Sequence, residues 1–371
     1  MHVFCFRYDI CNMRTLFLLF VFFFALSCTK KDSVFVGEIV KVANTPETIM
    51  LDGKEIILED IYDGYMSVYD SLMLFISGKY QDAFLYVFNL NSGNLVGQFC
   101  PRGQGPDDFL NLFHTEQYFV ENNDIKLWIC DRLTEKTYLL NLTQSIEQGK
   151  TVVDTLIIQK WRQNNSFPWG HSFVLDSDRF LIQSHPMFGK GNRDDSPFAA
   201  YHLYDKSIDN ELKKFDFFNK FPKGKENSHT MMALYSSYDR ISIQNHKIVC
   251  GMMFFSQINI LDIRTGELKG YRLKNTPGFD DMPEGPLVSY NHICADDKMI
   301  IGLYINQDFD IQLEHGNISD IIHIYDWDGN FLHIVKLDNK VIQVAFDPVG
   351  KCLYGYTPDE KIFRYDFKMF Y

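Results

Sequence analysis

The stretch INILDIRTGELKGYRL, residues 258–273, decides the fold of this chain. It contains an apolar strand that ends in a polar residue, a turn with Asp and Gly, and a second apolar strand, which together are typical of a β-hairpin. The same pattern recurs along the sequence. The further copies are LYVFNLNSGNLVGQF (85–99), KLWICDRLTEKTYLLNL (126–142), YHLYDKSIDNELKKF (201–215), IHIYDWDGNFLHIVKL (322–337) and the shortened KIFRYDF (361–367).

One polar residue closes the first strand of each copy and sets the phase of the repeat. The spacings between these residues are 42, 74, 57, 64 and 40, with an average copy of about 57 residues, and strand repeats of this size indicate a β-propeller. We therefore predict an all-β, six-bladed β-propeller over residues 34–371, with each hairpin forming the outer pair of a four-stranded blade. The phasing residues are Asn89, Asp131, Asp205, Asp262, Asp326 and Asp366.

The last copy contains one strand of its hairpin, so its blade needs a partner from elsewhere. VAFDPVGKCLYGY (344–356) predicts the inner half of this blade, and the N-terminal stretch 34–58 is the natural donor of the missing strand. Such sharing closes the ring and removes exposed strand edges. No notable helix is required. The alternative is a pair of long β-sandwiches without radial symmetry.

A local motif adds a family resemblance. Residues 97–109, GQFCPRGQGPDDF, contain a strand followed by G-x-G-P-x-x-F, and with the repeats they make the chain resemble the TolB-like six-bladed β-propeller lipoproteins of Bacteroidetes. The resemblance implies a propeller located at the cell envelope. It supplies no catalytic residues, because the role of that family is largely unassigned.

The N-terminus has the layout of an export signal. Arg14 precedes the apolar run LFLLFVFFFAL (16–26), which is too short for a membrane-spanning helix of about 20 residues, and Ser27 and Cys28 follow. Residues 1–27 are predicted to be a signal peptide and residues 28–33 a short tether. The segment resembles a lipoprotein lipobox, which implies lipidation of Cys28, although Ala25 stands where lipoboxes more often have Leu. The alternative is an ordinary secretory signal.

Several features of this N-terminus leave choices open. Translation starts at Met1 or at Met13, and we favour Met13 because Met13-Arg14 and the apolar run form a complete leader. A lipid anchor would hold the protein at the outer membrane. The tract after Cys28 mixes acidic and basic residues, so both the periplasmic and the surface face stay open.

Composition narrows the function classes. Cleavage after residue 27 of 371 leaves 344 residues, and the net charge of −12 becomes −13 because Arg7, Asp9 and Arg14 leave with the leader. An acidic chain without a basic stripe argues against nucleic-acid binding. The 33 Phe and 20 Tyr favour half-buried strands. We expect a monomer whose partner is a glycan, a peptide or an envelope protein.

Metal and redox motifs are missing from the sequence. The mature cysteines besides Cys28 form no CxxC pair, and we expect them to be small buried hydrophobic residues, with one unassigned disulfide left open. Adjacent acidic residues such as Asp107-Asp108 and Asp296-Asp297 are expected in solvated turns. His323 and His333 flank a turn but lack a visible third ligand. No cofactor and no metal are therefore expected. These cysteines are Cys100, Cys130, Cys250, Cys294 and Cys352.

Two segments carry candidate ligand-binding residues. Arg102 and Gln104 in the glycine-rich loop are candidates for contact with a ligand in the central cavity, although the favoured interpretation of the loop is an inter-blade connection that needs glycine and proline. Trp169 and His171 in SFPWGHSF (166–173) are candidates for a sugar platform, against an alternative of blade packing.

Two functional hypotheses follow. The first is an envelope lipoprotein whose propeller binds a ligand or protein without catalysis, and it is favoured because no catalytic motif is present. The alternative is a propeller hydrolase or lyase acting on a carbohydrate or lactone, with acidic residues from several blades meeting at the axis. The fold alone does not decide between them.

Overall fold

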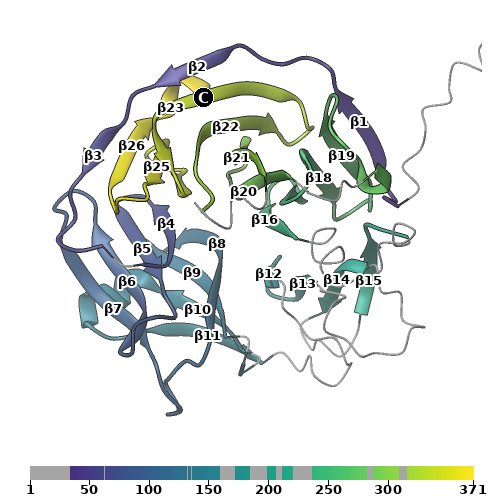
Figure 1. The fold of residues 1–371 in the computed structure, drawn as a ribbon. Coiled ribbons are helices and arrows are strands. Elements are labelled where there is room, and N and C mark those ends of the chain that lie inside the picture. Colours follow the sequence, from purple (N-terminus) through teal and green to yellow (C-terminus); the bar gives the residue numbers. More distant parts are fainter. Residues whose placement is uncertain are drawn as a thin grey trace, which may run out of the picture.

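The computed structural model describes residues 34–371 apart from 62, 132, 135, 159–171, 184–198, 206–210, 220–235, 282–286 and 309–315. The described strands form six sheets arranged around one axis, as Figure 1 shows, so the predicted six-bladed β-propeller is confirmed. The lipidation candidate Cys28 and the signal peptide lie outside the described residues. No helix in the described part of the chain is long and apolar enough to cross a membrane.

The first three blades are built from consecutive strands, which are given from the inner to the outer strand. Blade 1 contains β4 (Tyr65–Tyr69), β5 (Leu72–Ile76), β6 (Ala83–Asn89) and β7 (Leu95–Pro101). Blade 2 contains β8 (Leu112–Glu121), β9 (Asp124–Asp131), β10 (Lys136–Asn141) and β11 (Val153–Ile158). Blade 3 contains β12 (Ser172–Val174), β13 (Arg179–Gln183), β14 (Ala199–Asp205) and β15 (Glu211–Asp216).

The other three blades receive strands from the N-terminal segment. Blade 4 contains β16 (Ser237–Ser242), β17 (Lys247–Met252), β18 (Gln257–Asp262) and β19 (Leu268–Leu273). Blade 5 contains β20 (Leu287–Ala295), β21 (Met299–Asp308), β22 (Ser319–Asp326) and β23 (Phe331–Val341). Blade 6 contains β24 (Gln343–Asp347), β25 (Cys352–Tyr356) and β26 (Ile362–Asp366).

We call residues 34–56 the belt. Its strand β1 (Glu38–Val42) pairs in parallel with β19, and β2 (Thr48–Leu51) pairs in parallel with β23, which adds a fifth strand to blades 4 and 5. Its last strand, β3 (Lys54–Ile56), pairs antiparallel with β26 and completes blade 6. The belt is the purple segment along the outer edge in Figure 1. An N-terminal strand therefore closes the last blade as predicted, but most of stretch 34–58 covers two other blades instead.

Hydrophobic cores lie between neighbouring blades. Leu74 and Leu127, for example, belong to the core between blades 1 and 2, and Ile260 and Ile300 to the core between blades 4 and 5. Burial of apolar surface stabilises such interfaces by about 25 cal/mol per Å². The aromatic-rich inner and middle strands thus hold the ring by packing blade against blade.

The phasing residues end strands and bind the turns that follow. Asn89, Asp262 and Asp326 each accept hydrogen bonds from two backbone amides further along their own turn, with N···O distances of 2.8–3.2 Å. Short polar side chains are favoured in turns because they bind backbone in this way. The hairpin prediction is confirmed at these three positions, where the residue ends the third strand of its blade.

The copy at residues 126–142 has a different position from the one predicted. Asp131 ends the second strand, β9, so this hairpin is the middle pair of blade 2 and not its outer pair. The third strand ends at Asn141, which caps the helix α2 (Leu142–Gln148) by accepting a bond of 3.0 Å from the amide of Gln144. Taking Asn141 as the phasing residue changes the spacings of 42 and 74 to 52 and 64. This helix was not predicted.

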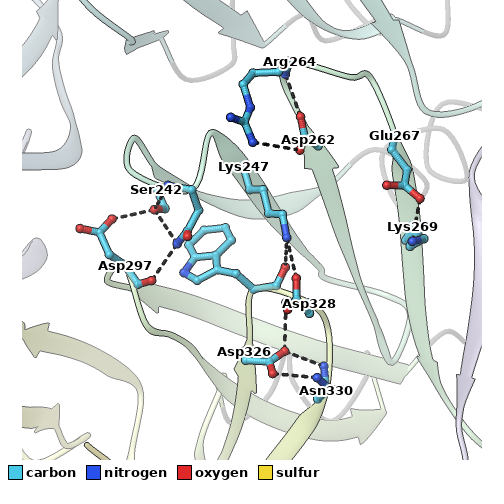
Figure 2. Close-up of polar contacts among 12 residues, drawn as sticks. Ser242, Lys247, Asp262, Arg264, Glu267, Lys269, Asp297, Asp326, Asp328 and Asn330 are labelled. Carbon is cyan, nitrogen blue, oxygen red and sulfur yellow. Dashed lines mark hydrogen bonds and ion pairs between the residues drawn. The ribbon is translucent and has the colours of Figure 1, made fainter.

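Polar contacts also tie blade 4 to blade 5, as Figure 2 shows. Lys247 Nζ donates to the Trp327 carbonyl and to Asp328 Oδ1, both at 2.8 Å, and Ser242 Oγ donates to Asp297 Oδ1 at 2.6 Å. Asp296 accepts from the amides of Lys298 and Met299 in the same acidic turn. The pair Asp296-Asp297 therefore stabilises a turn, as expected from the sequence.

Candidate functional site

The glycine-rich loop follows the outer strand of blade 1. The Arg102 guanidinium donates to the carbonyls of Gly78 and Tyr80, at 2.5 and 3.0 Å, and lies 4.5 Å from the centroid of the Phe84 ring. These contacts give Arg102 a role in holding two loops of its own blade together. Gln104 is exposed. Contact of Arg102 and Gln104 with a ligand stays a prediction.

Asp108 explains the two glycines of this loop. Its Oδ2 accepts a bond of 2.8 Å from the Gly105 amide, and a Cβ atom at Gly103 or Gly105 would collide with the same carboxylate. Phe109 is buried between blades 1 and 2. The motif therefore forms a compact inter-blade connection. The other predicted platform, Trp169 and His171, lies outside the described residues.

A second group of polar residues meets at the axis of the ring, and we call it the axial cluster. It comprises Tyr65 on β4, His114 and Glu116 on β8, Arg240 on β16 and His292 on β20. Tyr65 belongs to blade 1 and Arg240 to blade 4, which is the opposite blade of a six-membered ring. Side chains from opposite blades can bond only near the axis. The cluster therefore occupies the centre of the propeller.

An ion pair forms the middle of the axial cluster. Arg240 Nε donates to Glu116 Oε2 at 2.9 Å, and Arg240 Nη2 donates to Glu116 Oε1 at 2.5 Å and to the Tyr65 hydroxyl. The side chains of Arg240 and Glu116 are 6% and 13% exposed. Two parallel charge-assisted bonds of this kind fix the geometry as well as the charge. Arg240 therefore joins blade 4 to blades 1 and 2 at once.

Hydrogen-bond directions assign the proton positions. The Tyr65 hydroxyl donates to Glu116 Oε1 at 2.8 Å, so His292 Nε2, which lies 3.0 Å from the same hydroxyl, is the donor in that contact. His114 Nδ1 accepts from the Glu116 amide at 3.3 Å, which leaves the proton of the neutral ring on Nε2. Within the described residues this buried Nε2 has no hydrogen-bond partner. The cluster thus contains one unused donor.

The backbone at Glu116 is in an unusual conformation. Its φ of 55° lies in the left-handed region, and the β8–β9 register shifts between His114 and Tyr118. A non-glycine residue in this region costs about 1–3 kcal/mol and is often found at functional sites. The bulge places the Glu116 carboxylate at the axis.

Burial sets the pKa values of the cluster. Burial, with a smaller contribution from the Arg240 charge, lowers the pKa of His114 to about 3 and the pKa of His292 well below 6.5. Burial likewise raises the pKa of Tyr65 well above 10. At neutral pH both histidines are uncharged and Tyr65 keeps its proton. The charges of Arg240 and Glu116 cancel, so these five side chains have no net charge.

A layer of aromatic and amide groups adjoins the cluster. Tyr238, on the same strand as Arg240, packs its ring 5.8 Å from that of His292, and its hydroxyl donates to Asn291 Oδ1 at 3.3 Å. Asn291 Nδ2 donates to the Ile342 carbonyl at 3.0 Å. Tyr65 and Tyr238 are both partly exposed. Part of each of these two tyrosines therefore reaches solvent beside the buried groups of the axial cluster.

The described residues contain no group of three or more His, Cys, Asp or Glu that could hold a metal ion. The five cysteines predicted to be small buried residues are buried thiols. His323 is buried and stacks on Tyr304 at a centroid distance of 4.1 Å, whereas His333 packs against Phe370 at 5.1 Å. These two histidines thus serve packing.

The axial cluster was not predicted from the sequence. Glu116, Arg240 and His292 each lie in an aromatic strand that precedes the hairpin of its blade, and charged or imidazole groups in a buried inner strand are a usable signal. One charged or imidazole residue in a single inner strand is a weak indication of a site. It becomes informative only when the inner strands of several blades are compared, because the partners of each residue come from other blades.

Comparison with known proteins supports the fold. The sequence matches no family model, and no curated protein matches it. A member of the DUF4221 family from Bacteroides vulgatus has a similar structure, with a TM-score of 0.53 and 11% identity over 87% of this chain and 97% of that chain. A presumed exported protein from Bacteroides fragilis gives a TM-score of 0.47 and 11% identity over 86% and 99% of the two chains. At such identities the likeness concerns the fold alone.

Proposed function

We propose that this protein is an envelope lipoprotein whose propeller binds a ligand without catalysis, and that the ligand is received at the axial cluster. The observation that supports this most directly is the unused His114 donor beside the strained Glu116 and the Arg240 ion pair. A buried donor without a partner costs about 1–3 kcal/mol, and a ligand that accepts its proton recovers that energy.

The charge of the cluster favours a neutral ligand. Arg240 and Glu116 compensate each other, so neither an anion nor a cation gains a free counter-charge from them. The partly exposed residues Tyr65 and Tyr238 favour a ligand with an apolar face as well as hydroxyl groups. A neutral carbohydrate has both properties. We therefore place a neutral glycan first among the glycan, peptide and protein partners.

The envelope location in this proposal rests on the N-terminal sequence. Cys28 follows an apolar leader, and a structural neighbour carries the name of a presumed exported protein. Lipidation of Cys28 would anchor the mature chain durably, because hydrophobic anchoring gains about 0.8 kcal/mol per buried methylene. Replacement Cys28→Ala should release a folded, soluble protein. Retention of this variant in the membrane fraction would contradict the anchor.

Saturation-transfer NMR with a sugar panel tests ligand binding. The panel contains methyl glucoside, methyl mannoside, lactose and N-acetylglucosamine, with glucuronate and glucosamine as charged comparisons. We expect saturation-transfer signals from a neutral sugar. The affinity for that sugar should be at least tenfold lower in His114→Phe, because this variant removes the Nε2 donor and keeps an aromatic ring. His323→Phe is the matched control, since His323 is also buried but lies on β22. Binding that survives in His114→Phe would contradict the axial site.

A hydrolase or lyase is the second candidate, because Glu116 and two histidines surround Tyr65. Efficient general bases have a pKa near the working pH, whereas those of His114 and His292 are far lower. The cluster therefore suits binding better than proton transfer. Turnover of nitrophenyl glycosides or lactones that disappears in Glu116→Gln would favour the enzyme over the binding protein.

A further inference from the structure

The start of the belt is fixed at the rim between blades 3 and 4. The Asn219 amide donates to the Val34 carbonyl at 3.0 Å, and the Val36 amide donates to the Phe217 carbonyl at 2.9 Å. The Phe35 ring is fully buried, with centroid distances of 6.1 Å to Phe218 and 5.6 Å to Phe279. The belt therefore enters the fold on the far side of the ring from the junction of blades 6 and 1.

Chain length limits how far a lipid on Cys28 can lie from this point. Val34 is six residues beyond Cys28, and a chain spans at most about 3.6 Å per residue, or roughly 20 Å in total. Four strands at about 4.8 Å spacing give each blade a width of roughly 14 Å, so two opposite blades and the axis span about 40 Å. The opposite rim therefore lies beyond this reach.

We propose that the rim formed by blades 3 and 4 faces the lipid bilayer and that the junction of blades 6 and 1 points away from it. This inference rests on the proposed lipidation of Cys28. Val36 and Leu212, which are 42% and 47% exposed, provide apolar side chains on the same rim.

Two turns offer matched positions for a test. Arg264 and Asn91 each lie two residues after a phasing residue, in the turn between the third and fourth strands of blade 4 and of blade 1. Lys213 Nζ of blade 3 lies 3.5 Å from the Arg264 carbonyl, so this turn lies at the proposed rim. The Glu59 amide, just after the belt, donates to the Gly93 carbonyl, so the Asn91 turn lies near the end of the belt.

Single-cysteine labelling exploits the burial of the native thiols. Cys100, Cys130, Cys250, Cys294 and Cys352 are all at most 4% exposed, so a fluorophore will react mainly at an introduced Arg264→Cys or Asn91→Cys. The lipidated protein is inserted into phosphatidylethanolamine and phosphatidylglycerol vesicles that carry a nitroxide on the lipid headgroup. We expect at least twofold stronger quenching at position 264 than at position 91.

The outcomes separate this inference from the proposed anchor. Mass spectrometry of the N-terminal peptide reports whether Cys28 carries lipid, and Cys28→Ala gives the background quenching of unanchored protein. Lipid on Cys28 with equal quenching at both positions, or with stronger quenching at position 91, overturns the rim orientation alone. A Cys28 without lipid overturns both the anchor and the orientation.

Discussion

The two halves of the ring differ at their outer edges. In blades 4, 5 and 6 the belt supplies the outermost strand, whereas blades 1, 2 and 3 end in their own fourth strands β7, β11 and β15. At the axis the halves are not separate, because Arg240 of the belted half binds Glu116 and Tyr65 of the other half. The belt therefore secures one half from outside, while the axial cluster secures both from inside.

Acidification should destabilise both halves and produce the largest change in the free energy of unfolding. His114 lies in the unbelted half and His292 and His323 in the belted half, and burial is the main cause that lowers the pKa of each. Below pH 6.5 these three histidines bind more protons in the unfolded chain than in the folded chain, so their contribution to stability falls as the pH decreases towards about 3. Each histidine contributes about 1.4 kcal/mol per pH unit, or about 4 for all three.

Urea unfolding at pH 7.5 and pH 5.5 measures this acid sensitivity. His323→Phe should reduce the stability difference between these two pH values by about 1.4 kcal/mol, and His114→Phe by a similar amount, because each removes one group that is titrated in the unfolded chain near pH 6.5. The unbelted and the belted half would then contribute comparably to the loss of stability in acid. If the variant with both His114→Phe and His323→Phe kept the full loss of stability between pH 7.5 and pH 5.5, these histidines would not be the source of the acid sensitivity.

Removal of the belt's buried side chain should be the largest single-residue effect. Phe35→Ala deletes a fully buried ring between blades 3 and 4, for which we expect a loss of about 3–5 kcal/mol. Val36→Ala is the control at the neighbouring position, since a 42% exposed side chain should change stability by about 0.5 kcal/mol or less. Equal urea midpoints for the two variants would mean that the belt is not anchored through Phe35.

The sequence predicts the hairpins well because their signals are local. Asp262 and Asp326 bind the amides of the next few residues, so the polar residue and its turn stand together in the chain. Asp131 makes the same local contacts to the amides of Leu133 and Thr134 at the end of a second strand. The local hydrogen bonds are therefore the same at the end of a second strand and at the end of a third strand. For this reason the hairpin of blade 2 was assigned to the wrong pair of strands.

The belt and the axial cluster lack such local signals. Glu116 and Arg240 are 124 positions apart, and nothing near either residue identifies its partner. Stretch 34–58 was predicted to donate a strand to the last blade, but the pairing of β1, β2 and β3 with three different blades depends on where the chain crosses the rim. The architecture is therefore predictable from the sequence, whereas the candidate site requires the ring to be assembled.

Loss of the axial arginine should test how strongly the halves are joined. Arg240→Met leaves the Glu116 carboxylate buried without its partner, and we expect a loss of about 3 kcal/mol, because an uncompensated buried charge is costly. Adding Glu116→Gln should recover at least half of this loss. Strictly additive losses in a double-mutant cycle, measured by urea unfolding, would contradict direct coupling across the axis.

The turn caps should give the smallest effect and the most direct comparison of the two halves. Asn89→Ala in blade 1 and Asp262→Ala in blade 4 each remove two hydrogen bonds to backbone amides. We expect both to cost about 1 kcal/mol, because these bonds are made within a turn and do not involve the belt. Thermal unfolding of the two variants, with the exposed neighbour Asn91→Ala as control, measures the difference. A much larger loss for Asp262→Ala would mean that the belt transmits damage from its turn to the rest of blade 4, and the two halves would then differ in cooperativity as well as in strand number.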